Sequence, residues 1–443
     1  MRVPIGAALT SDLIGELPAN PVAALKAVLG WAWFYWFGPR GTNPLPCLEC
    51  GRVLLTWLAD TPRLNDLVRP IIKEMSLGEC NVIGGEPSIQ NQLSPGIGFC
   101  TKKQIGKIDM GNWRREYRQC YGAWCRQIWD WLCDHHLSFW LFPYLVYSLA
   151  IHSVYIYGFY RFLERVKPSL ILTDSEHNHP WNCLILVARQ LKIPTLQMMH
   201  GVIYTSYGYY PLLSDAALCW GEQQRSQMMS FGVQPERLLI TGCQRLRREN
   251  RCDGKNVRQR LGLPSELPVV MLATNPMPRE EWRKLVFTFG DAFRGNDDFV
   301  AVVKLHPSER RNSYREEMVR YPEMSLFESA EWSVEESMAA CDVVVSHNSG
   351  LGNDALVLRR PVVLLDVLKE SLSNGRGLAE RAGCPVVGSA IELRQIVTQI
   401  MTDQDYRQVL REHAEKYVTW FCYAYGQEAA RNVVDAVRRR TTK

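Results

Sequence analysis

The sequence has little excess charge of either sign. Its 51 lysines and arginines are nearly balanced by 46 aspartates and glutamates, which leaves a net charge of +5 over 443 residues. No run of basic residues is interleaved with aromatic ones, the composition by which nucleic-acid-binding chains are recognised. We therefore expect no nucleic acid as a partner. The mild positive charge still permits an anionic partner such as a nucleotide or a phospholipid surface.

The N-terminus lacks the pattern of a signal peptide. MRVPIGAALTSDLIGEL has no basic segment followed by an apolar core and a cleavage site, so we expect no cleaved leader. Two apolar, aromatic-rich stretches have to be considered as candidate membrane segments, residues 22–38 and 137–160. The second contains Pro143 and His152, and we expect a buried helix there rather than a spanning one. The first is a candidate for peripheral attachment to the inner face of a membrane.

Paired cysteines at regular spacings are also missing. The 14 cysteines are irregularly placed, and several lie inside apolar runs, where free cysteine behaves as a small core residue. Cys47 and Cys50 form one CxxC without a second pair, so a zinc site there is the weaker interpretation. Cysteine usage of this kind is typical of a reducing compartment, and we expect a cytoplasmic protein.

Short apolar runs alternate with amphipathic segments from residue 51 onward, an order typical of βαβ units with parallel sheets. The length fits two domains. The pattern predicts an α/β fold of two Rossmann-like, doubly wound domains that face a cleft. We place an N-terminal domain at 51–250 with a helical insert at 112–165, and a C-terminal domain at 266–443 with final helices at 403–440, after a variable segment 1–50. The strands are expected at 52–60, 80–85, 169–176, 193–201, 215–221, 236–242, 268–274, 298–307, 324–329, 341–347, 360–366 and 384–389.

Histidines follow two of these strands. In open parallel sheets, ligands bind at the carboxyl ends of the strands, so residues at these positions are candidates for a site. In VVKLHPSE, Lys304 precedes His306, and Pro307 fixes the backbone behind it. In QMMHG, His200 is followed by Gly201, which lets the backbone turn or approach a ligand closely. An imidazole beside helix N–H groups suits a phosphate.

A third strand ends in SHNSG at the start of a helix. Hydroxyls, an amide and a glycine at this position could hold an anion, although serine and asparagine are also ordinary helix caps. Asp354 follows on the first turns of the helix, where a carboxylate could reach a ribose hydroxyl. Neither GxxxxGK[ST] nor GxGxxG is present here, so we expect no nicotinamide or flavin cofactor. The cradle would be formed by Ser346, Asn348, Ser349 and Gly350.

The segment LILTDSEHNHPWN places two carboxylates and two histidines at the end of one strand, Asp174, Glu176, His177 and His179. Three interpretations remain open. A carboxylate could act as a general base on a hydroxyl. The four side chains could bind a metal ion, although this spacing is only weakly typical of one. They could also simply cap the helix that begins near Pro180.

The motifs HG, KLHP and SHNSGLGNDALVLRRPVVLL, in this order on two α/β halves, resemble GT-B glycosyltransferases of bacterial surface polysaccharides. The resemblance covers about residues 50–440. The most similar groups are capsule polysaccharide synthases, including Kdo transferases and polysialyltransferases, and CDP-glycerol glycerophosphotransferases. UDP-GlcNAc 2-epimerases share the last motif more loosely. Families of this type often have Ser-Ser or Ser-Thr where Asn348-Ser349 stands, which leaves the donor open.

The resemblance implies roles for these residues. His306 and Pro307 would contact the phosphates of a nucleotide-sugar donor together with Lys304, and Asp354 would contact its sugar or ribose. The SHNSG residues would hold phosphate. Gly201 and His177 would line the acceptor side, which binds a polysaccharide or lipid-linked saccharide. The base would be one of the catalytic candidates Asp174, Glu176 and His200.

The expected reaction is a metal-independent, inverting transfer from a CMP-, CDP- or UDP-linked sugar, without a cofactor. The resemblance leaves three alternatives, namely a glycerophosphotransferase, a 2-epimerase-like isomerase and a nucleotide-sugar-binding protein without activity. The long aromatic insert favours a transferase with a large or membrane-linked acceptor over an epimerase, which needs no such acceptor.

Overall fold

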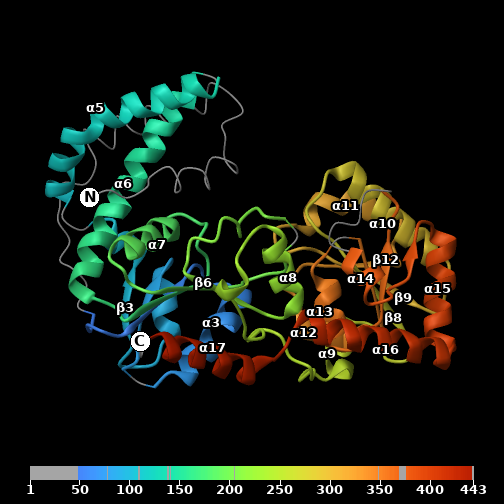
Figure 1. Cartoon of the computed structure of the whole chain (residues 1–443). Coiled ribbons are helices and arrows are strands. Elements are labelled where there is room, and N and C mark those ends of the chain that lie inside the picture. Colours follow the sequence, from blue (N-terminus) through green and yellow to red (C-terminus); the bar gives the residue numbers. More distant parts are fainter. Residues whose placement is uncertain are drawn as a thin grey trace. The chain divides into compact units, whose positions relative to one another are not determined.

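The computed structural model describes residues 48–441 except for short gaps at 77, 108–109, 137–138, 140, 204, 348 and 369–375. The stretch 22–38 and Cys47 therefore lie outside the described residues, as does Asn348. The chain divides into two compact units. Unit 1 combines the chain up to Arg245 with Gly426 onward, and unit 2 runs from Leu246 to Tyr425. Figure 1 shows the elements of each unit.

Unit 1 is built on a seven-stranded parallel sheet in the order β3-β2-β1-β4-β5-β6-β7. The direction of strand addition reverses between β1 and β4, which makes their carboxyl ends the switch point of the sheet. Most strands are short apolar runs buried on both faces, as parallel strands between helices require. Their bounds are β1 Val53–Trp57, β2 Cys80–Gly84, β3 Gly98–Thr101, β4 Leu170–Thr173, β5 Thr195–Met198, β6 Ala216–Cys219 and β7 Leu238–Ile240.

Helices flank this sheet. α3 begins with Thr61 as N-cap and Pro62 at its first position, a combination that favours helix initiation. The helices of unit 1 are α3 Pro62–Glu74, α4 Lys102–Ile105, α5 Met110–Asp134, α6 Leu141–Val166, α7 Trp181–Gln190, α8 Glu222–Ser230 and α17 Gly426–Thr441, with 3₁₀ turns η1 Pro87–Gln92 and η2 Pro235–Arg237.

The last helix corrects the expected domain boundary. The sequence placed 403–440 entirely with the C-terminal domain, but the structure places α17 in unit 1. Its apolar face, which includes Ala430, Val433 and Val437, joins the core cluster that contains β1 and α3. Burial of this apolar stripe against the first sheet is the physical reason for the return of the chain.

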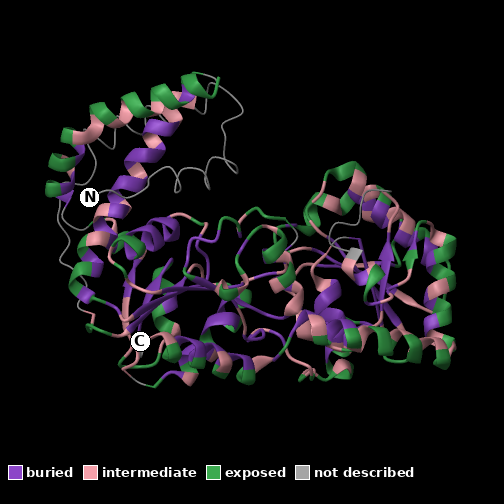
Figure 2. Cartoon of the chain, viewed as in Figure 1, coloured by how far each residue is buried: buried purple, intermediate pink, exposed green. Residues whose placement is uncertain are grey.

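The expected helical insert consists of two helices, α5 and α6. They pack through a small core that contains Trp113, Tyr117 and Val154. Figure 2 shows one side of α6 buried and much of α5 exposed. Within the part of the chain that the structure describes, no helix combines the length and apolar character needed to cross a bilayer.

Unit 2 has a six-stranded parallel sheet in the order β10-β9-β8-β11-β12-β13. Its switch point lies between β8 and β11. The strands are β8 Val269–Ala273, β9 Val300–Lys304, β10 Ser325–Phe327, β11 Val343–Ser346, β12 Val362–Leu365 and β13 Val386–Val387. The helices are α9 Gly254–Leu261, α10 Arg279–Phe293, α11 Arg315–Met318, α12 Val334–Ala340, α13 Leu351–Val357, α14 Arg376–Glu380, α15 Ala390–Thr402 and α16 Gln404–Phe421, with the 3₁₀ turn η3 Arg311–Tyr314.

The two doubly wound α/β units confirm the predicted fold class, and helices close the C-terminal part of the chain as expected. The edge strand β3 was not predicted. Its sequence GFCT is short and begins with Gly98, where an added Cβ would meet the side chain of Asn81 at 2.4 Å. A strand of this length gives too few residues to show an alternating pattern.

Candidate functional site

The switch point of unit 1 carries Asp174, directly after β4. Its side chain is fully buried. One oxygen accepts a hydrogen bond from the Thr56 hydroxyl at 2.7 Å, and the other accepts from the Leu58 N–H at 2.6 Å. Burial raises the pKa of Asp174 to about 6 against the opposing effect of these hydrogen bonds. The carboxyl group therefore connects the ends of β4 and β1.

Glu176, two residues further on, is also fully buried. Its two oxygens accept hydrogen bonds from the Leu213 and Ser214 N–H groups, both at 2.7 Å. His177 Nε2 lies 3.5 Å from the same carboxylate. Glu176 thus orders the backbone before β6 and lies beside the His177 ring. With both oxygens occupied by main-chain donors, it is a weaker candidate for the base than the sequence suggested.

His200 and Gly201 lie at the end of the neighbouring strand β5. The His200 ring stacks on Tyr209 with centroids 5.5 Å apart, and the Arg63 side chain donates to the His200 carbonyl at 3.0 Å. Burial, and next the Arg63 charge, lower the pKa of His200 to about 4, although the Asp174 backbone carbonyl acts in the opposite direction. A Cβ at Gly201 would meet the Arg63 guanidinium at 2.3 Å, so a larger residue here would displace that side chain.

The structure therefore places Asp174, Glu176, His177 and His200 at one edge of the first sheet. Arg63 was not predicted as part of the group. It lies in the first turn of α3, in TPRLND, which the sequence shows only as the start of a helix. Its contact with the end of β5 depends on how the sheet is assembled, which the sequence alone does not reveal.

His179 is directed elsewhere than the neighbouring acids. Its ring lies against His152 of α6, with centroids 4.7 Å apart, and against Tyr155 at 4.8 Å. The alternative of a metal ion shared by Asp174, Glu176, His177 and His179 does not fit this geometry, because Asp174 and Glu176 are occupied by backbone and hydroxyl donors.

In unit 2, the turn after β9 holds His306 by its backbone and its ring. The His306 N–H donates to Glu309 Oε2 at 2.9 Å. His306 Nδ1 accepts from the Ser308 N–H at 3.2 Å and lies 2.8 Å from the Ser308 hydroxyl. Since Nδ1 acts as an acceptor, the neutral ring carries its proton on Nε2. Pro307 itself is exposed.

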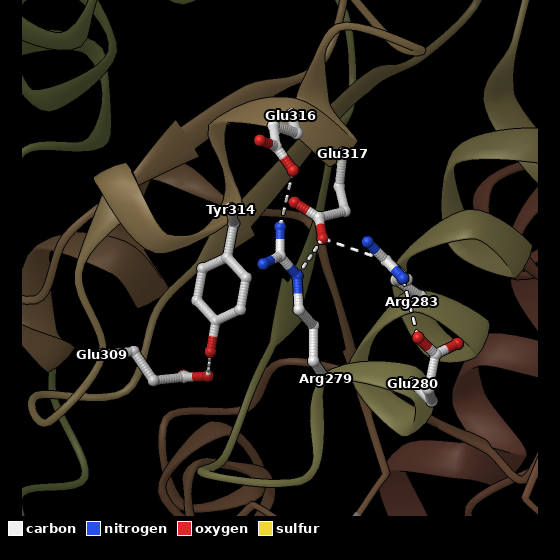
Figure 3. Close-up of polar contacts among 7 residues, drawn as sticks. All are labelled: Arg279, Glu280, Arg283, Glu309, Tyr314, Glu316 and Glu317. Carbon is white, nitrogen blue, oxygen red and sulfur yellow. Dashed lines mark hydrogen bonds and ion pairs between the residues drawn. The ribbon is translucent and has the colours of Figure 1, made fainter.

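Glu309 supports this turn from below. It is buried, and besides the His306 N–H it accepts hydrogen bonds from the Thr274 hydroxyl at 2.5 Å and the Tyr314 hydroxyl at 2.6 Å. The Tyr314 ring stacks on Trp282 of α10, with centroids 3.9 Å apart. Figure 3 shows Tyr314 and Glu309 beside a second group, in which Arg279, Arg283 and Glu317 join α10 to α11.

Lys304 differs from its expected role. Its side chain is buried, its Nζ donates to the Trp332 carbonyl at 2.7 Å, and the ammonium group lies 5.2 Å from the centre of the Trp332 ring. Burial lowers the pKa of Lys304 to about 8. These contacts favour a structural role for Lys304 over a contact with phosphate.

The turn after β11 is ordered by serines. The Ser346 hydroxyl accepts from the Ser349 N–H at 3.1 Å, and the Ser349 hydroxyl accepts from the Leu351 N–H at 3.3 Å. Gly350 directly precedes the seven-residue helix α13. Asp354 is buried on that helix, so a contact with a ribose would need it to become more accessible. Asn348 lies outside the described residues.

His347, which was not singled out in the sequence, is buried with Nδ1 3.0 Å from the Leu365 carbonyl and ties the ends of β11 and β12. Asn275 follows Thr274 at the end of β8, the strand that lies between β9 and β11. Among the described residues no hydrogen-bond partner is found for its buried Oδ1. Asn275 is therefore a further candidate for ligand contact at this edge.

Solved structures match most of the chain at low sequence identity. UDP-GlcNAc 2-epimerase from Neisseria meningitidis, bound to UDP-GlcNAc, matches with a TM-score of 0.52 and 13% identity, covering 88% of this chain and 100% of that chain. Anabaena Alr3699/HepE in complex with UDP and glucose matches at 0.55 and 11% identity, covering 88% and 99%. A glycosyltransferase from Rickettsia africae ESF-5 matches at 0.53 and 10% identity, covering 89% and 99%.

No protein-family model matches the chain, and no curated protein matches it significantly. At these identities the structural matches show the fold. The chain has the two-domain α/β architecture called GT-B, with its C-terminal helices.

Proposed function

We propose that this chain is a glycosyltransferase that moves a sugar from a nucleotide-activated donor to a hydroxyl of a surface polysaccharide or glycolipid acceptor. The observation that carries the proposal is the His306 turn, whose imidazole is fixed at the carboxyl edge of a parallel sheet. Structures of the same fold with UDP or a UDP-sugar support a nucleotide-linked substrate. We place the enzyme in the cytoplasm, at the inner face of the membrane, in the synthesis of a capsule or other cell-envelope polymer.

Donor binding is assigned to unit 2. The Nε2–H of His306 would donate to a phosphate oxygen, and the exposed Pro307 keeps the turn short. The Gly350 N–H and the Ser349 hydroxyl after β11 would supply further donors, while the Ser346 hydroxyl holds the turn in place by accepting from the Ser349 N–H. Displacement at an anomeric carbon needs stabilisation of the charge on the departing nucleoside diphosphate or monophosphate. The His306 Nε2–H group, whose turn is already fixed by buried Glu309, would provide that stabilisation without reorganisation.

Deprotonation of the acceptor is assigned to unit 1. Of the three candidates, His200 is the least buried, and its imidazole is neutral above about pH 4. We assign it as the base that accepts the hydroxyl proton. Asp174 and Glu176 would position the loop around it through their hydrogen bonds. Gly201 and His177 would line the acceptor side.

The transfer is proposed to proceed without a metal ion and with inversion. Imidazole and backbone donors would take the place of a divalent cation at the phosphates. Full activity that requires Mg²⁺ or Mn²⁺ would contradict this part of the proposal.

A 2-epimerase-like isomerase is the second candidate, because proteins named UDP-GlcNAc 2-epimerase share this fold over 88–89% of the chain. A CDP-glycerol-type glycerophosphotransferase differs only in the group that the nucleotide carries. Product analysis separates these activities. Free nucleotide formed only with an acceptor indicates transfer, and interconverted nucleotide-sugars indicate isomerisation. Nucleotide binding without either product indicates a binding protein.

The first experiment is a thermal-shift screen of the purified chain against CMP, CDP, UDP and GDP. We expect one nucleotide base to stabilise the protein, and His306→Ala to reduce that shift. His135→Ala, at an exposed histidine that follows α5, is the matched control. No shift with any nucleotide, or an equal shift in His306→Ala, would overturn the donor site.

A further inference from the structure

Two histidines and a cysteine meet where α6 packs on α7, outside the edge described above. These residues are His152 of α6, His179 in the loop before α7, and Cys183 in the first turn of α7. His152 and Cys183 are buried and His179 is half-buried. One ligating atom from each residue lies within 4.8 Å of the other two.

The local structure explains how they converge. His179 lies two residues before α7, and Cys183 lies in the first turn of that helix, so the two residues flank its start. Cys183 Sγ lies 3.9 Å from the His152 carbonyl, which brings α7 directly against α6. The rings of His152 and His179 are arranged edge to face, with centroids 4.7 Å apart.

His152 is already oriented as a ligand. Its Nδ1 lies 2.7 Å from the Ser148 carbonyl, one turn earlier on α6. The carbonyl can only accept, so Nδ1 carries the proton and Nε2 the lone pair. A backbone carbonyl on the distal nitrogen is the arrangement that fixes the tautomer of metal-binding histidines.

We propose that His152, His179 and Cys183 form a zinc site that ties α6 to α7. Imidazole and thiolate together select zinc among the common divalent ions, and three protein ligands leave one tetrahedral position for water. Ligand atoms in a tetrahedral zinc site lie roughly 3.5 Å apart, so each side chain needs to move by less than about 1 Å. The zinc site takes no part in the proposed sugar transfer, and the zinc proposal does not depend on the proposed function.

The consequence of this tie concerns the loop between β4 and α7. That loop runs from Asp174 to Pro180 and carries His179 near its far end, so zinc would fix this end while Asp174 and Glu176 fix the rest. The ion would hold the insert helix α6 and this loop in one arrangement.

The test uses the full, reduced chain. We expect about one zinc per chain by elemental analysis, and a zinc-edge X-ray absorption spectrum with one sulfur at about 2.3 Å and two imidazole nitrogens at about 2.0 Å. Zinc added to the metal-free protein should raise its melting temperature. A zinc ion bound instead by Cys47 and Cys50 would show at least two sulfurs and would overturn the assignment.

Variants localise the ion. Cys183→Ser, His179→Ala and His152→Ala should each lose most of the bound zinc, whereas Cys219→Ser, at another buried cysteine of the same unit, should keep it. Zinc content that is equal in all four variants would contradict the proposal, as would wild-type protein that binds none or that contains copper instead. The absorption spectrum of the wild-type protein decides the matter even where a variant fails to fold.

Discussion

Glu309 shows at the scale of a residue how the proposed donor site is positioned. One buried carboxylate receives two hydroxyl donors and the N–H of His306, so the loss of its side chain leaves several buried groups without a partner. The turn and the histidine that it presents therefore depend on a side chain that would not itself touch the donor.

We expect Glu309→Ala to destabilise unit 2 by about 3 kcal/mol, since unsatisfied buried donors are costly. Glu309→Gln should lose less, because its amide oxygen can still accept from the His306 N–H while its NH₂ group donates to the Tyr314 oxygen. Thermal unfolding measures the loss of stability, and the nucleotide-induced shift in melting temperature measures whether His306 still binds the nucleotide. Tyr314→Phe, which removes one hydroxyl, is the control for a small loss. Equal stability of Glu309→Ala and wild type would refute this role.

His200 and Asp174 predict opposite contributions to the pH dependence of stability. The pKa of His200 is lowered to about 4, so the stability it contributes is present above about pH 6.5 and is lost as the pH falls toward 4. The pKa of Asp174 is raised to about 6, so its contribution is complete below about pH 4 and is lost as the pH rises through 6.

Melting temperatures between pH 4 and pH 7 test this pair. Relative to wild type, His200→Gln should lose less stability on acidification, whereas Asp174→Asn should lose more. Curves for the two variants that run parallel to that of wild type would show that neither group titrates in this range.

At the scale of elements, α17 is the clearest case of a helix whose existence the sequence predicts and whose partner it does not. The apolar periodicity of residues 426–441 indicates a helix with one buried face. It carries no information on which sheet covers that face, because the partner elements β1 and α3 lie more than 350 residues earlier. The same limit applies to Lys304, whose contact with Trp332 depends on the packing of the loop after β10.

By contrast, residues that follow strands were predictable. Parallel strands align their carboxyl ends, so Asp174, His200 and His306 could be placed at sheet edges from periodicity alone. Glu309, Arg63 and Asn275 could not, since their roles depend on atoms of elements that are distant in the sequence.

Val433→Asp tests the position of α17. An uncompensated charge on the buried face should cost about 3 kcal/mol or more, with loss of the thermal transition of unit 1 at its normal temperature. Arg431→Asp introduces the same residue on the exposed face and should change the melting temperature little. Limited proteolysis should release the C-terminal helix only in Val433→Asp. Similar behaviour of the two variants would mean that α17 contributes nothing to unit 1.

At the scale of the whole molecule, the proposal divides binding and chemistry between two sheets. The residues assigned to the donor lie in unit 2, and the assigned base lies in unit 1. Substitutions in the two units should therefore affect different kinetic constants.

We expect His306→Ala to weaken nucleotide binding about tenfold, which corresponds to about 1.4 kcal/mol for one lost hydrogen bond to a charged group. His200→Gln should leave the nucleotide Kd within about twofold of wild type while kcat falls by about 100-fold or more, the typical contribution of a general base. Lys304→Met should change neither constant, because its ammonium group is engaged by the Trp332 carbonyl.

Calorimetric titration measures the nucleotide Kd of these variants, and steady-state kinetics on the same preparations measures their kcat. If His200→Gln weakens nucleotide binding as strongly as His306→Ala, binding is not confined to unit 2 and the base must be sought elsewhere. If Lys304→Met weakens nucleotide binding, the lysine contacts the donor despite its buried position.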